Sequence, residues 1–181
     1  AFSLFYGGFC LSQQKMKNLT RTGLLLALTL VFQSLRFLIP LPPWMSTFVI
    51  GSLVNAALLV ALQALGMRSA LLIACVTPVV AWLQQLLPLP VFILPVAVGN
   101  SLYIWLFSRL RRAGPEWLAV GSAALGKAAF FFLAFRGLLS VLELPPALST
   151  AILFVMGWPQ LVTGLVGGFI AIYAWRRLEK I

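Results

Sequence analysis

Lys127 is the residue of this chain best placed to do chemistry, because it is an ionisable side chain in the middle of a long apolar run. It lies ten residues into the run from Trp117 to Leu139. That is ~15 Å along a helix, and therefore near the centre of a ~30 Å hydrocarbon core. Since no Asp or Glu occurs inside an apolar run, we expect its partner to be an anionic ligand. The alternative is a lysine that lines water or contacts backbone carbonyl groups.

The first apolar run has a polar face and a small-residue face. Thr29, Gln33 and Arg36 follow the i, i+4, i+7 spacing of one helix face, which should point into the protein because lipid would penalise it. Gly23 and Ala27 lie on roughly the opposite side and form a small-x-x-x-small pair that allows close approach of another helix. We expect this pair to look outward, toward lipid or a partner protein. The alternative is ordinary packing within the protein.

Eight residues are candidates for substrate binding, because they are polar, charged or aromatic and lie in or beside the apolar runs. They are Lys127, Asn100, Gln33, Arg36, Gln160, Trp44, Arg136 and Gln84. A helix turns ~900° over the nine residues from Lys127 to Arg136, which puts these two side chains on opposite faces. Lys127 is therefore the stronger candidate, and the alternative for Arg136 is snorkelling to the interface. Further polar or aromatic candidates are Asn55, Gln85, Thr163, Trp82, Tyr103 and Trp158.

Enzyme chemistry is not expected from this composition. The chain has no His and only three acidic residues, which removes the commonest general base and leaves little for carboxylate chemistry. Two cysteines without metal-site spacing predict neither a metal centre nor a disulfide. No GxxxxGK[ST] pattern occurs, so we expect no cofactor in this chain and any use of ATP to fall to partner subunits.

The composition predicts an all-α integral membrane protein with six transmembrane helices. Of the 181 residues, 62% are hydrophobic and 9% are charged, and the mean hydropathy is +1.05, unlike a soluble domain or a disordered chain. The apolar runs are continuous rather than alternating, which favours helices over a barrel. Six runs are separated by proline, glycine or charged residues, at about Thr22–Ile39, Thr47–Leu65, Ser69–Leu87, Val91–Ser108, Trp117–Leu139 and Leu148–Trp175.

The basic residues predict that both termini are cytoplasmic. Cytoplasmic segments of membrane proteins are enriched in Lys and Arg, and this assignment places ten of the thirteen basic residues inside: Lys15, Lys17, Arg21, Arg68, Arg109, Arg111, Arg112, Arg176, Arg177 and Lys180. The outer segments 40–46, 88–90 and 140–147 have none. The net charge of +10 is then mainly a topology signal. We expect no nucleic-acid binding, because the charge is divided among short loops and termini.

The first fifteen residues stand apart from the rest. Their apolar part is too short to cross a bilayer, and no basic segment precedes it as in a signal peptide. We interpret residues 1–15 as an N-terminal extension that is not native, with a short interfacial segment as the alternative. Residues 16–181 are expected to form a single six-helix membrane domain.

From Met16 to Ile181 the chain resembles the S components of energy-coupling factor (ECF) vitamin transporters. The resemblance rests on a basic start followed by TRTGLLLALTLVFQSLRF, on a proline-rich outer segment PLPPWMS, and on PVAVGNSLYIWLF followed by RLRR. It implies a multi-pass protein of the bacterial cell membrane that binds a vitamin-like metabolite with high affinity near the outer face. The polar candidates in the spans suit an anionic or carboxylate-bearing substrate.

The resemblance also implies partners: a transmembrane coupling subunit and two ATPase subunits. In this family a small-residue motif of the first helix contacts the coupling subunit, and Gly23-x-x-x-Ala27 is its nearest match here, with Gly in place of the first Ala. The first outer segment acts as a lid, a role that Leu41 to Ser46 could take. Metal-transporting members use N-terminal His ligands, so the lack of His argues against a metal substrate.

Two other functions remain open from the sequence. One is a structural membrane protein of the cell envelope, and the other is a stand-alone secondary transporter, which the prolines inside the runs permit. An intramembrane enzyme is the poorest alternative. The sequence does not identify the substrate: riboflavin, folate, pantothenate, biotin, thiamine precursors and modified bases all stay open.

Overall fold

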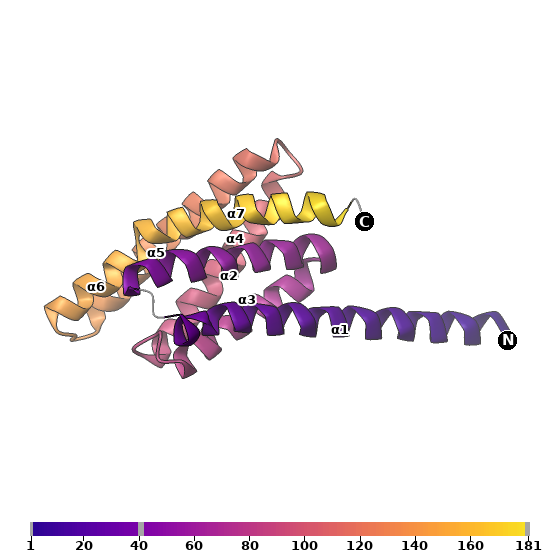
Figure 1. Ribbon diagram of the computed structural model, residues 1–181, viewed down its shortest axis with the longest axis horizontal. Coiled ribbons are helices and arrows are strands. Elements are labelled where there is room, and N and C mark those ends of the chain that lie inside the picture. Colours follow the sequence, from indigo (N-terminus) through magenta and orange to yellow (C-terminus); the bar gives the residue numbers. More distant parts are fainter. Residues whose placement is uncertain (1, 40–41, 180–181) are drawn as a thin grey trace.

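The computed structural model is a bundle of helices that run back and forth along one common direction (Figure 1). It describes the backbone of residues 2–39 and 42–179, and the side chains of residues 15–39, 42 and 45–179. Within those residues the chain forms seven α-helices and one 3-10 turn, and no strand. They are α1 (Phe2–Leu38), α2 (Pro43–Leu65), α3 (Met67–Leu83), η1 (Pro90–Phe92), α4 (Ile93–Leu110), α5 (Glu116–Val141), α6 (Pro146–Met156) and α7 (Trp158–Leu178).

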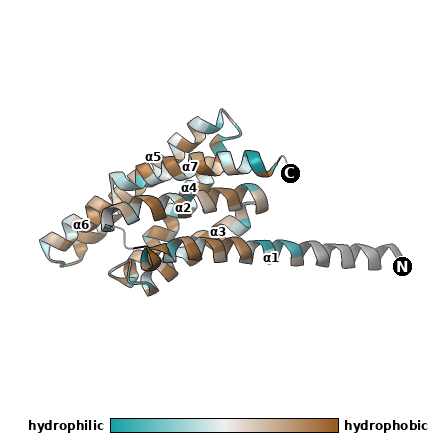
Figure 2. Ribbon diagram, in the orientation of Figure 1, coloured by the Kyte–Doolittle hydropathy of each residue, from teal (hydrophilic) through white to brown (hydrophobic). Residues whose placement is uncertain are grey.

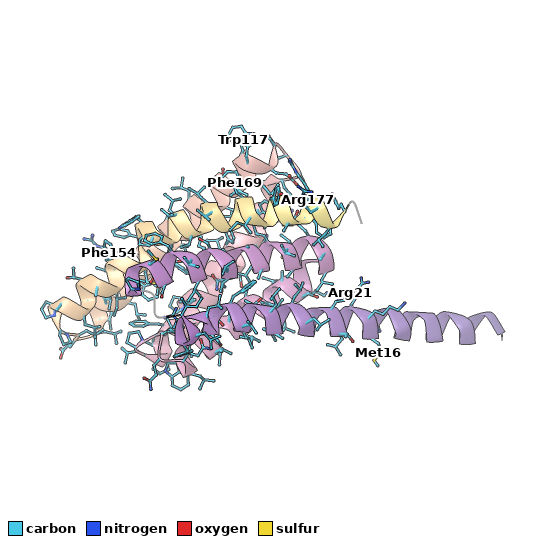
Figure 3. All side chains as sticks on the ribbon, viewed as in Figure 1. Met16, Arg21, Trp117, Phe154, Phe169 and Arg177 are labelled. Atoms are coloured by element: carbon cyan, nitrogen blue, oxygen red, sulfur yellow. The ribbon has the colours of Figure 1, made fainter. Side chains whose placement is uncertain are left out.

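The described helices are those of a multi-pass membrane protein. Five segments are long and apolar enough to cross a bilayer: Lys15–Leu38, Met45–Leu65, Pro90–Leu110, Glu116–Val141 and Pro146–Leu178. The third predicted run is represented by α3, which has 17 residues and is ~25 Å long, somewhat less than a ~30 Å hydrocarbon core. Large apolar side chains such as Trp117, Phe154 and Phe169 are more than half exposed and point away from the bundle (Figure 3), as lipid contact requires.

Two predicted runs differ from the helices that form. The third run was expected to continue to Leu87, but α3 ends at Leu83 because Gln85 adopts a left-handed conformation (φ 59°) and the Leu86 N–H turns back to Ala81 O at 2.9 Å. The sixth run is predicted as one span with an interrupting proline, Pro159, inside it. It divides into α6 and α7 at Gly157, whose backbone is not helical (φ −94°, ψ −121°).

Backbone chemistry explains where the helices begin and end. Proline occupies the first turn of α2, α6 and α7, where its missing N–H costs no hydrogen bond. Gly66, with a φ of +89°, separates α2 from α3, a conformation that residues with a Cβ avoid. The long helix α1 includes the residues interpreted as an N-terminal extension from Phe2 onward, and whether these residues are native stays a prediction.

The two ends of the bundle differ in charge. The start of α1, the α2–α3 junction, the α4–α5 connection and the end of α7 lie toward one end, and the other connections lie toward the opposite end (Figure 1). Hydrophilic residues gather on α1 and α7 at the first of these ends (Figure 2), which carries Arg21 and Arg177 (Figure 3). We call it the basic end. That this end faces the cytoplasm stays a prediction.

Small residues let the helices approach closely. Alanines at 56, 61, 70, 74, 119, 123, 124 and 171 are buried in the main core, and α2 packs extensively against α7. A Cβ added at Gly167 of α7 would lie 2.5 Å from Ser52 O and 3.0 Å from Ala56 N, both backbone atoms of α2. The absence of a side chain at this position is therefore a condition for the α2–α7 contact.

Gly167→Ala is expected to destabilise the protein by ~1–3 kcal/mol, because the backbone of α2 must shift to admit the methyl group. The measurement is thermal unfolding in detergent. The matched control is Gly121→Ala in α5, where an added Cβ meets nothing within 4 Å and helix propensity favours alanine. A Gly167→Ala protein that unfolds at the same temperature as wild type contradicts the close α2–α7 contact.

Candidate functional site

A cavity of about 180 Å³ lies in the half of the bundle away from the basic end. All seven α-helices contribute to its lining: the end of α1, the first halves of α2 and α4, the ends of α3 and α6, the middle of α5 and the start of α7. Its polar lining residues are Gln33, Arg36, Thr47, Asn55, Thr77, Asn100, Lys127 and Gln160. So many polar groups in the apolar part of a membrane bundle are typical of a binding site.

Lys127 is the most buried charged group of the cavity, with an exposed fraction of 2%. Its Nζ donates a hydrogen bond to Asn55 Oδ1 at 2.6 Å. It also lies 5.3 Å from the ring centroid of Tyr103 and 5.4 Å from that of Phe131, within cation–π range. An ammonium has three N–H donors, and Asn55 is the one acceptor that the described residues supply. Lys127 therefore keeps donors for a ligand.

A chain of hydrogen bonds orients the Asn55 amide. Asn55 Nδ2 donates to Thr163 Oγ1 at 3.3 Å, and Thr163 Oγ1 donates to Gln160 O at 3.2 Å. Because the NH₂ group of Asn55 faces Thr163, its carbonyl oxygen must face Lys127. Residues of α2, α5 and α7 are thus joined in one polar network, which holds the ammonium in place.

No carboxylate of the described residues lines the cavity. The chain has three acidic residues. Glu116 pairs with Arg176 at 3.0 Å, Glu179 accepts a hydrogen bond from Trp175 Nε1 at 2.6 Å, and Glu143 is an exposed residue between α5 and α6. Hydrogen bonding and the two rings stabilise the Lys127 ammonium, but they do not neutralise its charge.

Gln33 and Arg36 supply two further unsatisfied groups. Gln33 is buried and its Nε2 donates to Thr77 O at 3.2 Å, while its Oε1 has no partner in the described part of the chain. The Nε of Arg36 is likewise buried without a hydrogen-bond partner among the described residues. Buried polar atoms are normally paired, so an acceptor at Gln33 and a donor at Arg36 are available to a bound molecule.

The structure brings together five of the eight predicted binding residues and leaves three elsewhere. Gln33, Arg36, Asn100, Lys127 and Gln160 all line the cavity. Gln84 does not line it, and its Nε2 instead donates to Ser34 Oγ at 3.0 Å. Arg136 is exposed on α5, on the side away from Lys127 as the helical spacing predicts, and Trp44 has its side chain outside the described part of the structure.

Asn55 and Thr163 are central to the site in the structure, although the sequence placed them only among the further candidates. Asn55 is an amide in the middle of a mainly apolar helix, and this central position is the signal that could have ranked it higher. The contact between its carbonyl and Lys127 depends on α7, which packs against both α2 and α5. The ring of Tyr103, a further aromatic candidate, lies beside Lys127, and its OH donates to Gly164 O at 2.6 Å.

The two faces of α1 are oriented as predicted. Thr29 and Gln33 are buried and Arg36 lines the cavity, whereas Gly23 and Ala27 are exposed. A Cβ added at Gly23 would meet nothing within 4 Å. The pair therefore packs against no other described helix of this chain and stays accessible to lipid or to another protein.

Asn55→Leu is expected to destabilise the protein by ~1–3 kcal/mol, because it leaves the buried Lys127 ammonium without its acceptor. Thermal unfolding in detergent measures the effect. The matched control is Gln63→Leu on the same helix. Among the residues that the structure describes, the Nε2 of Gln63 donates to Leu59 O within its own helix, and its Oε1 has no partner. Equal unfolding temperatures for the two variants would contradict the role of Asn55.

Comparisons of this chain with protein-family models, with curated proteins and with solved structures give no match. Function is therefore inferred from the residues that line the cavity. Among the described residues, no group of three His, Cys, Asp or Glu side chains comes together to bind a metal ion. The groups present are cations and amides, which can form hydrogen bonds to a small polar molecule.

Proposed function

We propose that this protein is the membrane-embedded binding subunit of an ECF-type transporter and takes up a small, vitamin-like anionic metabolite. One observation carries the proposal: Lys127 is buried at a polar cavity that no described carboxylate lines. A buried charge without a counter-ion is costly. An anion bound in the cavity offsets that cost and gains charge-assisted hydrogen bonds.

The remaining lining suits recognition of a small metabolite. Amides from Asn100 and Gln160, and the free acceptor of Gln33, can fix the orientation of its polar groups. Apolar residues such as Ile50 and Val96 complete the lining and supply the contact area that most ligand sites use. A volume of about 180 Å³ lies below the usual range for drug-sized ligands, roughly 300–1,000 Å³, which favours a small molecule.

The distribution of charge supports uptake from outside the cell. The basic end would face the cytoplasm of a bacterial cell, and the cavity then lies in the outer half of the membrane. A metabolite would reach the cavity from the external side. Transport across the inner half requires a further conformational step, and ATP hydrolysed by the partner subunits would drive it.

The exposed small-residue pair on α1 supports a protein partner. Gly23 and Ala27 leave the backbone of α1 open to close approach, and the proposed occupant is the transmembrane coupling subunit, which joins this protein to two ATPase subunits. No ATP site is proposed in this chain.

A second candidate function is a stand-alone secondary transporter, favoured by the break between α6 and α7. Gln160, three residues after the break at Gly157, lines the cavity, and discontinuous helices beside substrate sites are common in such transporters. Purified protein in vesicles, without any ATPase, separates the two functions. Ion-driven uptake there would support the secondary transporter.

Lys127→Met is expected to lower the amount of bound metabolite at least tenfold, because it removes the buried positive charge while keeping an unbranched side chain. The measurement is denaturation of the detergent-purified protein and mass spectrometry of the small molecules released. The matched control is Arg136→Ala, an exposed cation of the same helix, which should retain the wild-type amount. Equal occupancy in Lys127→Met and wild type would remove Lys127 from the site.

Asn55→Asp is expected to lower metabolite binding at least tenfold without lowering the unfolding temperature of the empty protein. The new carboxylate stands where Asn55 Oδ1 now lies, 2.6 Å from Lys127 Nζ, so it competes with the anionic metabolite for the ammonium. Titration calorimetry with the released metabolite and thermal unfolding give the two readouts. Unchanged affinity would show that the metabolite does not need the free charge of Lys127.

Ala27→Leu is expected to reduce uptake by cells at least fivefold while metabolite binding by the purified protein stays within twofold of wild type. The larger side chain blocks approach of the coupling subunit to α1. The control is Ala129→Leu, another exposed alanine, on α5. Co-purification with the coupling subunit and the ATPase pair should fall in parallel, and normal assembly of Ala27→Leu would argue against this interface.

A further inference from the structure

The cavity holds a second cation whose charge the described residues leave uncompensated. Arg36 lines it together with Lys127, and its buried Nε has no acceptor among the described residues. The one ion pair that the described residues form is Arg176 with Glu116, on α7 and at the start of α5. The described lining of this small cavity therefore carries two positive charges and no negative charge.

The two cations approach the cavity from different sides. Arg36 belongs to α1, which packs against α2 and α3, whereas Lys127 belongs to α5, which packs against α4, α6 and α7. The helices α1 and α5 do not pack extensively against each other, so the two cations reach the same cavity from separate helices. An anionic group opposite Lys127 pairs with the ammonium but leaves the buried Nε of Arg36 without an acceptor, which a second acidic group on the same molecule supplies.

We infer that the metabolite bound here carries two separate oxyanion groups, one opposite Lys127 and one opposite Arg36. This inference rests on the proposed binding function and narrows its substrate class to small dianions, with carboxylate or phosphate as the acidic groups. Lys127 binds one group as a point charge with spare N–H donors, and the planar guanidinium of Arg36 binds the other.

Gln33 adds a requirement at the Arg36 end. It lies one turn before Arg36 on α1, and because its Nε2 donates to Thr77 O, its unpartnered Oε1 can only accept. The metabolite should therefore have an N–H or O–H donor close to the acidic group that Arg36 binds. Amino, hydroxyl or amide groups beside the acid satisfy this requirement.

The test begins with the small molecule released by denaturing the purified wild-type protein. Methyl esterification followed by mass spectrometry counts its carboxylates, and phosphatase treatment detects a phosphate, so the two sources of negative charge are distinguished. Two acidic groups on different parts of the molecule are expected. A released molecule with one acidic group overturns the inference and leaves the proposed function intact, whereas a molecule with no acidic group also contradicts the proposed anionic substrate.

The second measurement is the molar ratio of this molecule to protein in purified variants. Arg36→Met and Lys127→Met should each lower the ratio at least tenfold, while Arg136→Ala, an exposed cation outside the cavity lining, should not change it. Arg36→Gln replaces Arg36→Met if the latter does not purify as a single species. A ratio within twofold of wild type in either Arg36 variant overturns the inference. Wild-type protein that releases no small molecule contradicts the binding function itself, and the inference with it.

Discussion

A positive charge without a negative partner, held inside a membrane bundle, is the constraint on which the rest of this structure depends. Lys127 is 2% exposed and no described carboxylate lines its cavity. The protein keeps the ammonium in place with neutral groups, namely the carbonyl of Asn55 and the rings of Tyr103 and Phe131. Because dipoles and rings stabilise a charge without cancelling it, the site stays attractive to an anion.

The packing of the helices positions the neutral groups that surround Lys127. Asn55 reaches both Lys127 and Thr163 because α2, α5 and α7 lie close together, and α2 and α7 can do so because Gly167 has no side chain to separate them. Gly167 lies directly against Asn55, so this small residue sets the position of a polar group of the cavity. Hydrogen-bond direction then follows from the chain Asn55–Thr163–Gln160, which leaves the Asn55 carbonyl with Lys127 as its partner.

The cavity and the proposed partner surface lie in different parts of the molecule. The cavity occupies the half away from the basic end, while α1 turns Gln33 and Arg36 toward the cavity and Gly23 and Ala27 outward. One helix therefore contributes both to the proposed ligand site and to the proposed partner surface. Such a helix is well placed to link the occupancy of the cavity to the contact with a partner.

The sequence by itself determined the membrane class, the helices and the orientation of residues within one helix, because hydropathy and the helical repeat act along a single segment. The inward stripe of α1, and the burial of Lys127 against the exposure of Arg136, follow from that repeat. Only the tertiary structure decided which polar groups meet. It paired Lys127 with Asn55, left Gln84 with Ser34 outside the cavity, and ended α3 at Leu83, because such contacts depend on the spacing and crossing of helices that are distant in the chain.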